Sequence, residues 1–141
     1  MLTLKQWPKN AGLLIVIYNN PLYTGNNMSP GLIARTSNIP GIIGLKQTNP
    51  DLGQLVEVLR TSREGFSILT GIDSQLYPAL CIGTVGIFST AACVAPRMMV
   101  EIDDAFAQGH HKKALATHTR IMILATLLSP ETKGRELHAY E

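Results

Sequence analysis

A lysine stands at the point where an apolar segment of the chain ends. Residues 41–45 are Gly-Ile-Ile-Gly-Leu, Lys46 follows them directly, and a polar turn comes next. Burial disfavours the charged form of an amine, so a lysine in such a place gains nucleophilic character. A neutral amine can attack the carbonyl carbon of a ketone or aldehyde and form a Schiff base. The alternative is a lysine whose charged end reaches solvent and does no chemistry.

A tyrosine occupies the matching place on an earlier apolar segment. Residues 13–17 are Leu-Leu-Ile-Val-Ile, and Tyr18 follows them. Schiff-base chemistry requires protons to be moved on and off the reacting groups, and a well-placed phenol can do this. The pattern therefore makes Lys46 the candidate nucleophile and Tyr18 the candidate acid/base.

Strand-like and helix-like segments alternate along the chain. Continuous apolar runs typical of strands buried on both faces occur at 13–21, 41–46, 66–71 and 85–90. Segments with helical features occur at 28–38, 49–65, 73–83, 95–109 and 110–129. This alternation predicts an α/β protein with a parallel sheet covered by helices.

Capping residues and prolines predict where three of the helices begin or break. Ser29 and Asn49 are expected to cap their helices, since each precedes a proline that suits the first helical position. Pro78 is expected to interrupt the helix at 73–83.

The ends of the predicted strands should meet at one edge of the sheet. In parallel α/β folds, the carboxyl ends of the strands and the loops that follow them carry the chemistry. Tyr18, Lys46, the segment 70–73 and the pair Ser89–Thr90 all occupy such positions. We therefore expect these residues to converge on one site at the carboxyl-terminal edge of the sheet.

Composition narrows the classes of function. Hydrophobic residues make up 45% and charged residues 16% of the 141 residues, which is typical of a globular domain with its own core. The net charge of +2 and the scattered basic residues argue against a nucleic-acid partner. No apolar run reaches the roughly 18 residues of a membrane span. The adjacent His110 and His111 cannot share one ligand sphere on a helix, so no metal site is expected. The two cysteines lack metal-ligand spacing, which favours a reduced, cytoplasmic compartment.

Four motifs, taken together, resemble a known enzyme family. In order and spacing, they are similar to the second half of the dihydrodipicolinate synthase / N-acetylneuraminate lyase family, from about Leu13 to about Leu128. These proteins are pyruvate-handling class I aldolases and lyases with a (β/α)8 barrel. The motifs are "YNNPLYTG", "GIIGLKQTN", "FSILTGID" and "GTVGIFSTAACVAPRMMVEIDDAFAQGHHKKA".

The resemblance implies a role for individual positions. Lys46 matches the Schiff-base lysine, and Tyr18 matches the tyrosine that relays protons to the imine and substrate. The implied substrate-binding positions are Thr24 in the loop after Tyr18, Gly71 and Asp73 in the pocket lining, and Ile87 through its backbone carbonyl. The implied ligand is a 2-oxo acid such as pyruvate, held through the lysine imine without a cofactor.

Two departures from the family pattern shape the expected fold and substrate. Tyr23 stands where the synthases carry an arginine that binds a substrate carboxylate, which favours the broader set of lyases and dehydratases. The first four barrel units, with the loop that binds the pyruvate carboxylate, have no counterpart here, whereas a full barrel needs roughly 250 residues. The expected fold is a partial barrel, units five to eight plus a C-terminal helix, over residues 1–129. A polar tail at 130–141 is expected to be loose.

Three interpretations follow from these observations. The first is a Schiff-base lyase or aldolase of 2-oxo acids. The second is a truncated, catalytically incompetent half-barrel, or a scaffold subunit that needs a partner. The third is a small flavodoxin-like sheet that binds an anion. It is the least favoured, because no glycine-rich turn follows the first predicted strand. In the first two cases open strand edges favour a homo-oligomer.

Overall fold

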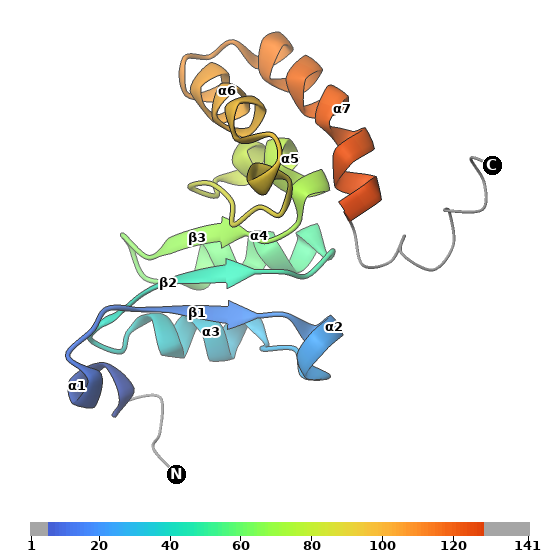
Figure 1. Ribbon diagram of the computed structural model, residues 1–141. Helices are drawn as coiled ribbons and strands as arrows, with labels where there is room; N and C mark the ends of the chain where they lie inside the picture. Colours follow the sequence, from blue (N-terminus) through green and yellow to red (C-terminus); the bar gives the residue numbers. More distant parts are fainter. Residues whose placement is uncertain (1–5, 129–141) are drawn as a thin grey trace.

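The computed structural model describes residues 6–128 and contains a parallel three-stranded sheet (Figure 1). The strands β1 (Ile15–Asn19), β2 (Ile42–Gln47) and β3 (Ser67–Thr70) lie side by side in chain order. Their register pairs Tyr18 with Lys46, and Lys46 with Leu69. The predicted α/β class with parallel strands is confirmed.

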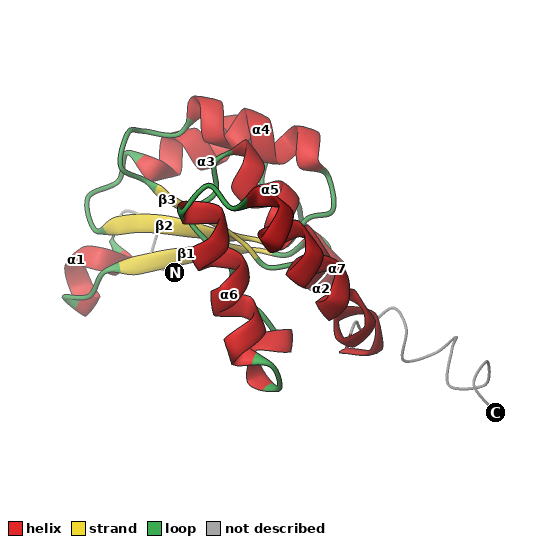
Figure 2. Ribbon diagram, turned by 90° about the horizontal axis from the view of Figure 1, so that it is seen from above, coloured by secondary structure: helices red, strands yellow, loops and turns green. Residues whose placement is uncertain are grey.

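Helices connect the strands and continue beyond them. Figure 2 shows α3 and α4 together on one side of the sheet, while α5, α6 and α7 gather beside β3. The bounds are α1 (Trp7–Ala11), α2 (Pro21–Thr24), α3 (Pro30–Ser37), α4 (Leu52–Thr61), α5 (Leu76–Ile82), α6 (Pro96–Ala107) and α7 (His111–Leu128), with 3-10 turns η1 (Asp73–Gln75) and η2 (Ala91–Cys93). No helix within residues 6–128 combines the length and apolarity needed to cross a bilayer.

The helix starts agree with the sequence at one place and differ at another. Ser29 caps α3, because its hydroxyl accepts a hydrogen bond from the Leu32 amide at 3.3 Å. The expected cap at Asn49 is wrong, since α4 begins two residues later than predicted and Asp51 accepts from the Gln54 amide at 3.0 Å. The Asn49 side chain instead accepts from the Asp51 backbone, which forms a turn ahead of the helix.

Two further expectations from the sequence are wrong. Residues 85–90 do not form a full fourth strand, because their described pairing with β3 is a single bridge between Thr70 and Ile87 and a hydrogen bond from the Val85 amide to the Ile68 carbonyl. Gly86 has φ of 147°, a conformation that takes the chain out of regular β geometry and limits the pairing. Pro78 does not interrupt α5, because it lies in the first turn, where the amide it lacks has no partner within the helix.

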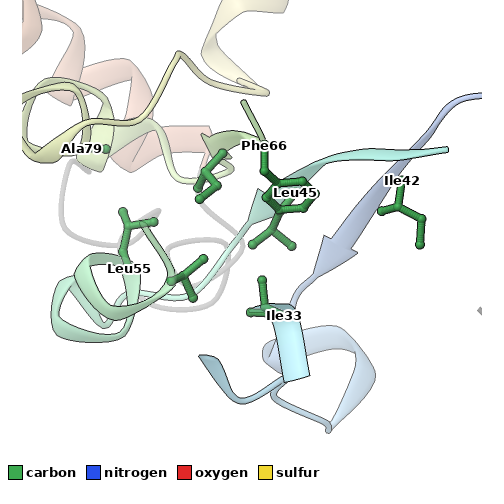
Figure 3. Close-up of a cluster of buried hydrophobic side chains, with 8 residues drawn as sticks. Ile33, Ile42, Leu45, Leu55, Phe66 and Ala79 are labelled. Carbon is green, nitrogen blue, oxygen red and sulfur yellow. The ribbon is translucent and has the colours of Figure 1, made fainter. Parts of the chain in front are cut away.

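The main hydrophobic core lies between the sheet and α3 and α4 (Figure 3). Leu45 and Ile42 of β2 are fully buried and pack with Ile33 of α3 and with Leu55 and Val58 of α4. Burial of each such side chain contributes about 1.5–3 kcal/mol. This core fixes which face of each strand is covered.

The opposite face of the sheet is largely exposed. Val16 and Tyr18 on β1 are 41% and 50% exposed, and Phe88 beside β3 is 47% exposed. The expectation that the strand at 13–21 is buried on both faces is therefore wrong. The helices within residues 6–128 cover one face of β1, so its side chains alternate between more buried and more open positions. Lys46 lies on the open face, opposite Tyr18.

A second core joins α5, α6 and α7 beside the sheet. Ile102 of α6 and Ile121 of α7 are fully buried and pack with Leu76 of α5. His118 of α7 is only 7% exposed, and its Nδ1 atom has no hydrogen-bond partner among the described residues. Burial lowers the pKa of His118 and outweighs the opposing hydrogen bond with the Ser74 backbone. The domain boundary expected at residue 129 and the polar tail at 130–141 lie outside the described residues.

Acidification should destabilise the fold through His118. Its pKa in the folded protein lies below the ordinary value of 6.5, so the unfolded chain binds the proton first. The free energy of unfolding should therefore fall as the pH drops below about 6.5. Urea unfolding at about pH 7.5 and about pH 5.5, on either side of the ordinary histidine pKa, measures the loss.

Substitution of the buried and of an exposed histidine separates this effect from general acid sensitivity. His118→Phe should weaken the dependence on pH, whereas His110→Gln should retain it because His110 is exposed. Equal loss of stability in all three proteins would contradict the assignment.

Candidate active site

Lys46 and Tyr18 face each other across paired strands. They are register partners on β1 and β2, and the Lys46 Nζ atom lies 4.4 Å from the centroid of the Tyr18 ring. Phe88 lies on the other side, with its ring centroid 5.7 Å from the same nitrogen. Both rings attract the ammonium group through their π faces. The half-buried lysine is thus held between two aromatic rings on the open face of the sheet.

Gly71 allows the backbone after β3 to lie against the lysine. A Cβ atom added at this position would come 2.7 Å from the Lys46 Cε atom and would also collide with the Thr48 hydroxyl. The Gly71 amide donates to the Gln47 carbonyl at 2.8 Å, which fixes this approach. Glycine is therefore required here for close packing around the lysine side chain.

The phenol of Tyr18 has polar neighbours that stabilise its ionised form. The Asn20 side-chain amide donates to the phenol oxygen at 2.6 Å. Partial burial acts to raise the pKa of Tyr18, but the Asn20 hydrogen bond, the neighbouring Thr48 hydroxyl and the Lys46 charge together outweigh it and lower the pKa. A phenol in this setting releases its proton more readily than an exposed tyrosine does.

A cluster of side-chain amides fixes the carboxyl ends of β1 and β2. Asn19 donates to Gln47 at 2.9 Å and to Asn27 at 3.1 Å. Gln54 of α4 exchanges hydrogen bonds with Asn27, and Asn49 donates to Asn27 at 3.3 Å. Asn19 and Gln47 are buried, and their mutual bond pairs the Asn19 Nδ2 atom with the Gln47 Oε1 atom, whereas the Gln47 Nε2 atom has no partner among the described residues. The cluster keeps the ends of the two strands in register.

The remaining residues expected to bind substrate have defined places in the fold. Thr24 ends α2, and its hydroxyl donates within its own loop, to the carbonyl of Asn20 at 2.9 Å. The carboxylate of Asp73 accepts from the Ser89 hydroxyl and from the Ala91 amide, the latter at 3.0 Å. Asp73 therefore ties the end of β3 to the loop that begins η2.

The backbone N–H and C=O groups of Ile87 point away from β3. Thr70 bonds to the Gly86 carbonyl at 3.1 Å and to the Phe88 amide at 2.9 Å. In a parallel bridge of this kind, the N–H and C=O groups of the intervening Ile87 point to the opposite side. The Ile87 carbonyl is thus directed away from the described strands.

The structure brings Lys46, Tyr18 and Gly71 into one cluster and leaves Thr24 in a separate loop. Sequence reasoning missed Phe88 and Asn20, which both approach this cluster. A sequence signal for Asn20 existed, because it lies at the end of the same apolar segment as Tyr18. No sequence pattern pointed to Phe88. Within residues 6–128, no three histidine, cysteine, aspartate or glutamate side chains are grouped so that they could hold a metal ion.

Comparison with known proteins finds one family model and several named proteins that are similar to this chain. The model of the dihydrodipicolinate synthetase family matches residues 7–139. A 4-hydroxy-tetrahydrodipicolinate synthase of Archaeoglobus fulgidus is 38% identical over 118 residues, which are 84% of this chain and 41% of that protein. A synthase of the same name from Syntrophus aciditrophicus is 39% identical over 135 residues, which are 96% of this chain and 46% of that protein.

Solved structures agree with the sequence matches. The dihydrodipicolinate synthase of Aquifex aeolicus superposes with a TM-score of 0.84 at 28% identity, covering 89% of this chain and 43% of that one. A prophage protein of the same family from E. coli, solved in complex with pyruvate, gives 0.80 at 27% identity, covering 84% and 41%. The expected partial barrel is confirmed, since the matched chains are more than twice as long as the matched part. The chain belongs to the dihydrodipicolinate synthetase family and spans less than half the length of the curated relatives described here.

Proposed function

We propose that this chain carries the Schiff-base centre of a lyase or aldolase that acts on pyruvate-related 2-oxo acids. The observation that carries the proposal is the placing of Lys46 against Tyr18, on paired positions of β1 and β2. Family membership supports it, because the relatives described above are named synthases and one related structure holds pyruvate.

The proposed chemistry begins when the ammonium group of Lys46 gives a proton to water and becomes a neutral amine. Its nitrogen attacks the C2 carbonyl of the 2-oxo acid to give a carbinolamine, and loss of water then leaves a protonated imine. In the cleavage direction the C3–C4 bond breaks, and its electron pair forms the C2=C3 bond of an enamine as the protonated imine is neutralised. C4 leaves as an aldehyde, and its hydroxyl gives its proton to the Tyr18 phenolate. Tyr18 supplies the proton that converts the departing hydroxyl to water and recovers it in later steps.

A second interpretation is that the chain keeps the site residues but cannot catalyse the reaction. The chain spans less than half the length of its relatives, and the face of the sheet that bears Lys46 is largely uncovered. Tyr23, for which the family resemblance implies an arginine that binds a substrate carboxylate, is 69% exposed and carries no positive charge. On this interpretation the chain is a half-barrel or scaffold subunit that retains the site residues without turnover.

Reduction of a trapped imine tests the proposal directly. Incubation with pyruvate and borohydride should add one pyruvate-derived group to the intact chain, mapped to Lys46 by peptide mass spectrometry. Lys46→Met should abolish the adduct, and Lys112→Met should retain it, because Lys112 is exposed on α7. Adducts spread evenly over the lysines would contradict the assignment, and no adduct at all would favour the incompetent half-barrel.

Tyr18→Phe should slow the chemistry more than it weakens binding. The ring and its contact with Lys46 remain, but the hydroxyl that moves protons is lost. Removal of a positioned acid/base reduces rates by about 10²–10⁴-fold. The rate of imine formation with pyruvate, measured with rapid borohydride quenching, should fall by that order while half-saturation changes little. A rate within about twofold of the unsubstituted chain, well below that range, would show that Tyr18 only packs.

We also propose that the chain associates with further copies of itself along β1. This strand pairs on one side only among the described residues. Leu13 and Leu14, just before the strand, are 68% and 71% exposed, and with Trp7 and Val16 they line an apolar hollow of about 650 Å³. Apolar surface beside an unpaired strand edge favours association.

Sedimentation velocity at micromolar concentration tests this association. We expect a dimer or a larger species, and Leu14→Lys should shift it toward monomer. Ile123→Lys is the matched control, since Ile123 on α7 is equally exposed at 71% but lies away from β1. A stable monomer before any substitution would contradict the proposal.

A further inference from the structure

Asn20 is a buried residue whose side chain makes one hydrogen bond among the described residues, and that bond ends at the candidate acid/base. It is 1% exposed, and its Nδ2 atom lies 2.6 Å from the Tyr18 phenol oxygen. Its Oδ1 atom has no hydrogen-bond partner among the described residues. Buried amides are normally paired at both ends, so a half-paired amide directed at a phenol calls for an explanation.

We propose that Asn20 is a positioning residue that holds the Tyr18 phenol in place and stabilises its ionised form during proton transfer. This role rests on the proposed function of Tyr18. Catalysis by Tyr18 needs a phenol that can give up its proton and regain it, and a donor on its oxygen favours the ionised state.

The backbone around Asn20 gives the side chain a fixed base. Its carbonyl oxygen accepts from the Tyr23 amide at 3.2 Å, from the Thr24 amide at 3.0 Å and from the Thr24 hydroxyl at 2.9 Å. Asn20 also stands directly before Pro21, the first residue of α2. The start of α2 therefore anchors Asn20, and the amide reaches the phenol from a part of the chain that three hydrogen bonds hold.

The direction of the hydrogen bond determines its effect. As donor, the Asn20 amide leaves the hydrogen of the phenol free to point toward Lys46 or a bound carbonyl group. Lys46 adds a positive charge over the face of the same ring, with its nitrogen 4.4 Å from the ring centroid. The two groups act together, so that the phenolate is stabilised from both the loop and the neighbouring strand.

Titration of Tyr18 by NMR tests this inference without any need for activity. In the chain labelled with 13C at the tyrosine ring carbons, the Tyr18 signal is identified by its absence in Tyr18→Phe. Asn20→Leu keeps the size of the side chain but removes the donor, and it should move the Tyr18 titration to higher pH. Asn26→Leu makes the same change at an exposed loop position and should leave the titration unmoved. A Tyr18 titration that stays in place or moves to lower pH in Asn20→Leu would overturn the proposal.

A second measurement uses the unsubstituted chain and so does not depend on the folding of Asn20→Leu. The side-chain amide protons of Asn20 should shift with the same midpoint as Tyr18, and that shift should disappear in Tyr18→Phe. If the chemical shifts of these amide protons do not change as Tyr18 ionises, the proposed positioning role of Asn20 would be overturned. A failure of imine trapping, by contrast, would count against the proposed function and leave these titrations unaffected.

Discussion

The parallel pairing of β1 with β2 determines the relation between the two candidate catalytic side chains. Tyr18 and Lys46 are far apart in sequence, and only the register of these strands makes them neighbours. A shift of one residue would turn one of the two side chains to the helix-covered face. On the helix-covered face the register is fixed by Leu45 and Ile42, which are buried against α3 and α4. It is held at the carboxyl end by the amide cluster around Asn19 and Gln47.

The same arrangement separates stability from chemistry. Ile42 and Leu45 of β2 face the helices and are buried and apolar, whereas Lys46 faces the open side with Tyr18 and Phe88. The alternation of side chains along a strand allows both functions within one short segment. Changes on the open face should therefore affect the site more than the core, and changes on the covered face should do the opposite.

Much of this arrangement could be predicted from local sequence. Short-range patterns predict the strand ends, the Ser29 cap and the positions of Tyr18 and Lys46, since each depends on residues close in the chain. The fourth strand was overestimated because apolar content does not reveal the conformation of Gly86, which limits pairing to one bridge. Asn49 and Asp51 are both good caps, and only the turn between them decides which one is used. Phe88 escaped prediction because its approach to Lys46 depends on how the loop after α5 folds back beside β3.

The close approach of Gly71 has a consequence for the entropy of ligand binding. A lysine side chain normally samples many rotamers, and ordering it costs about 1.5–2 kcal/mol. Here the Gly71 backbone, the Tyr18 ring and the Phe88 ring confine the side chain from several sides before any ligand arrives. Folding therefore bears this loss of freedom in advance, and a ligand that contacts the Lys46 amine has less side-chain motion to restrict.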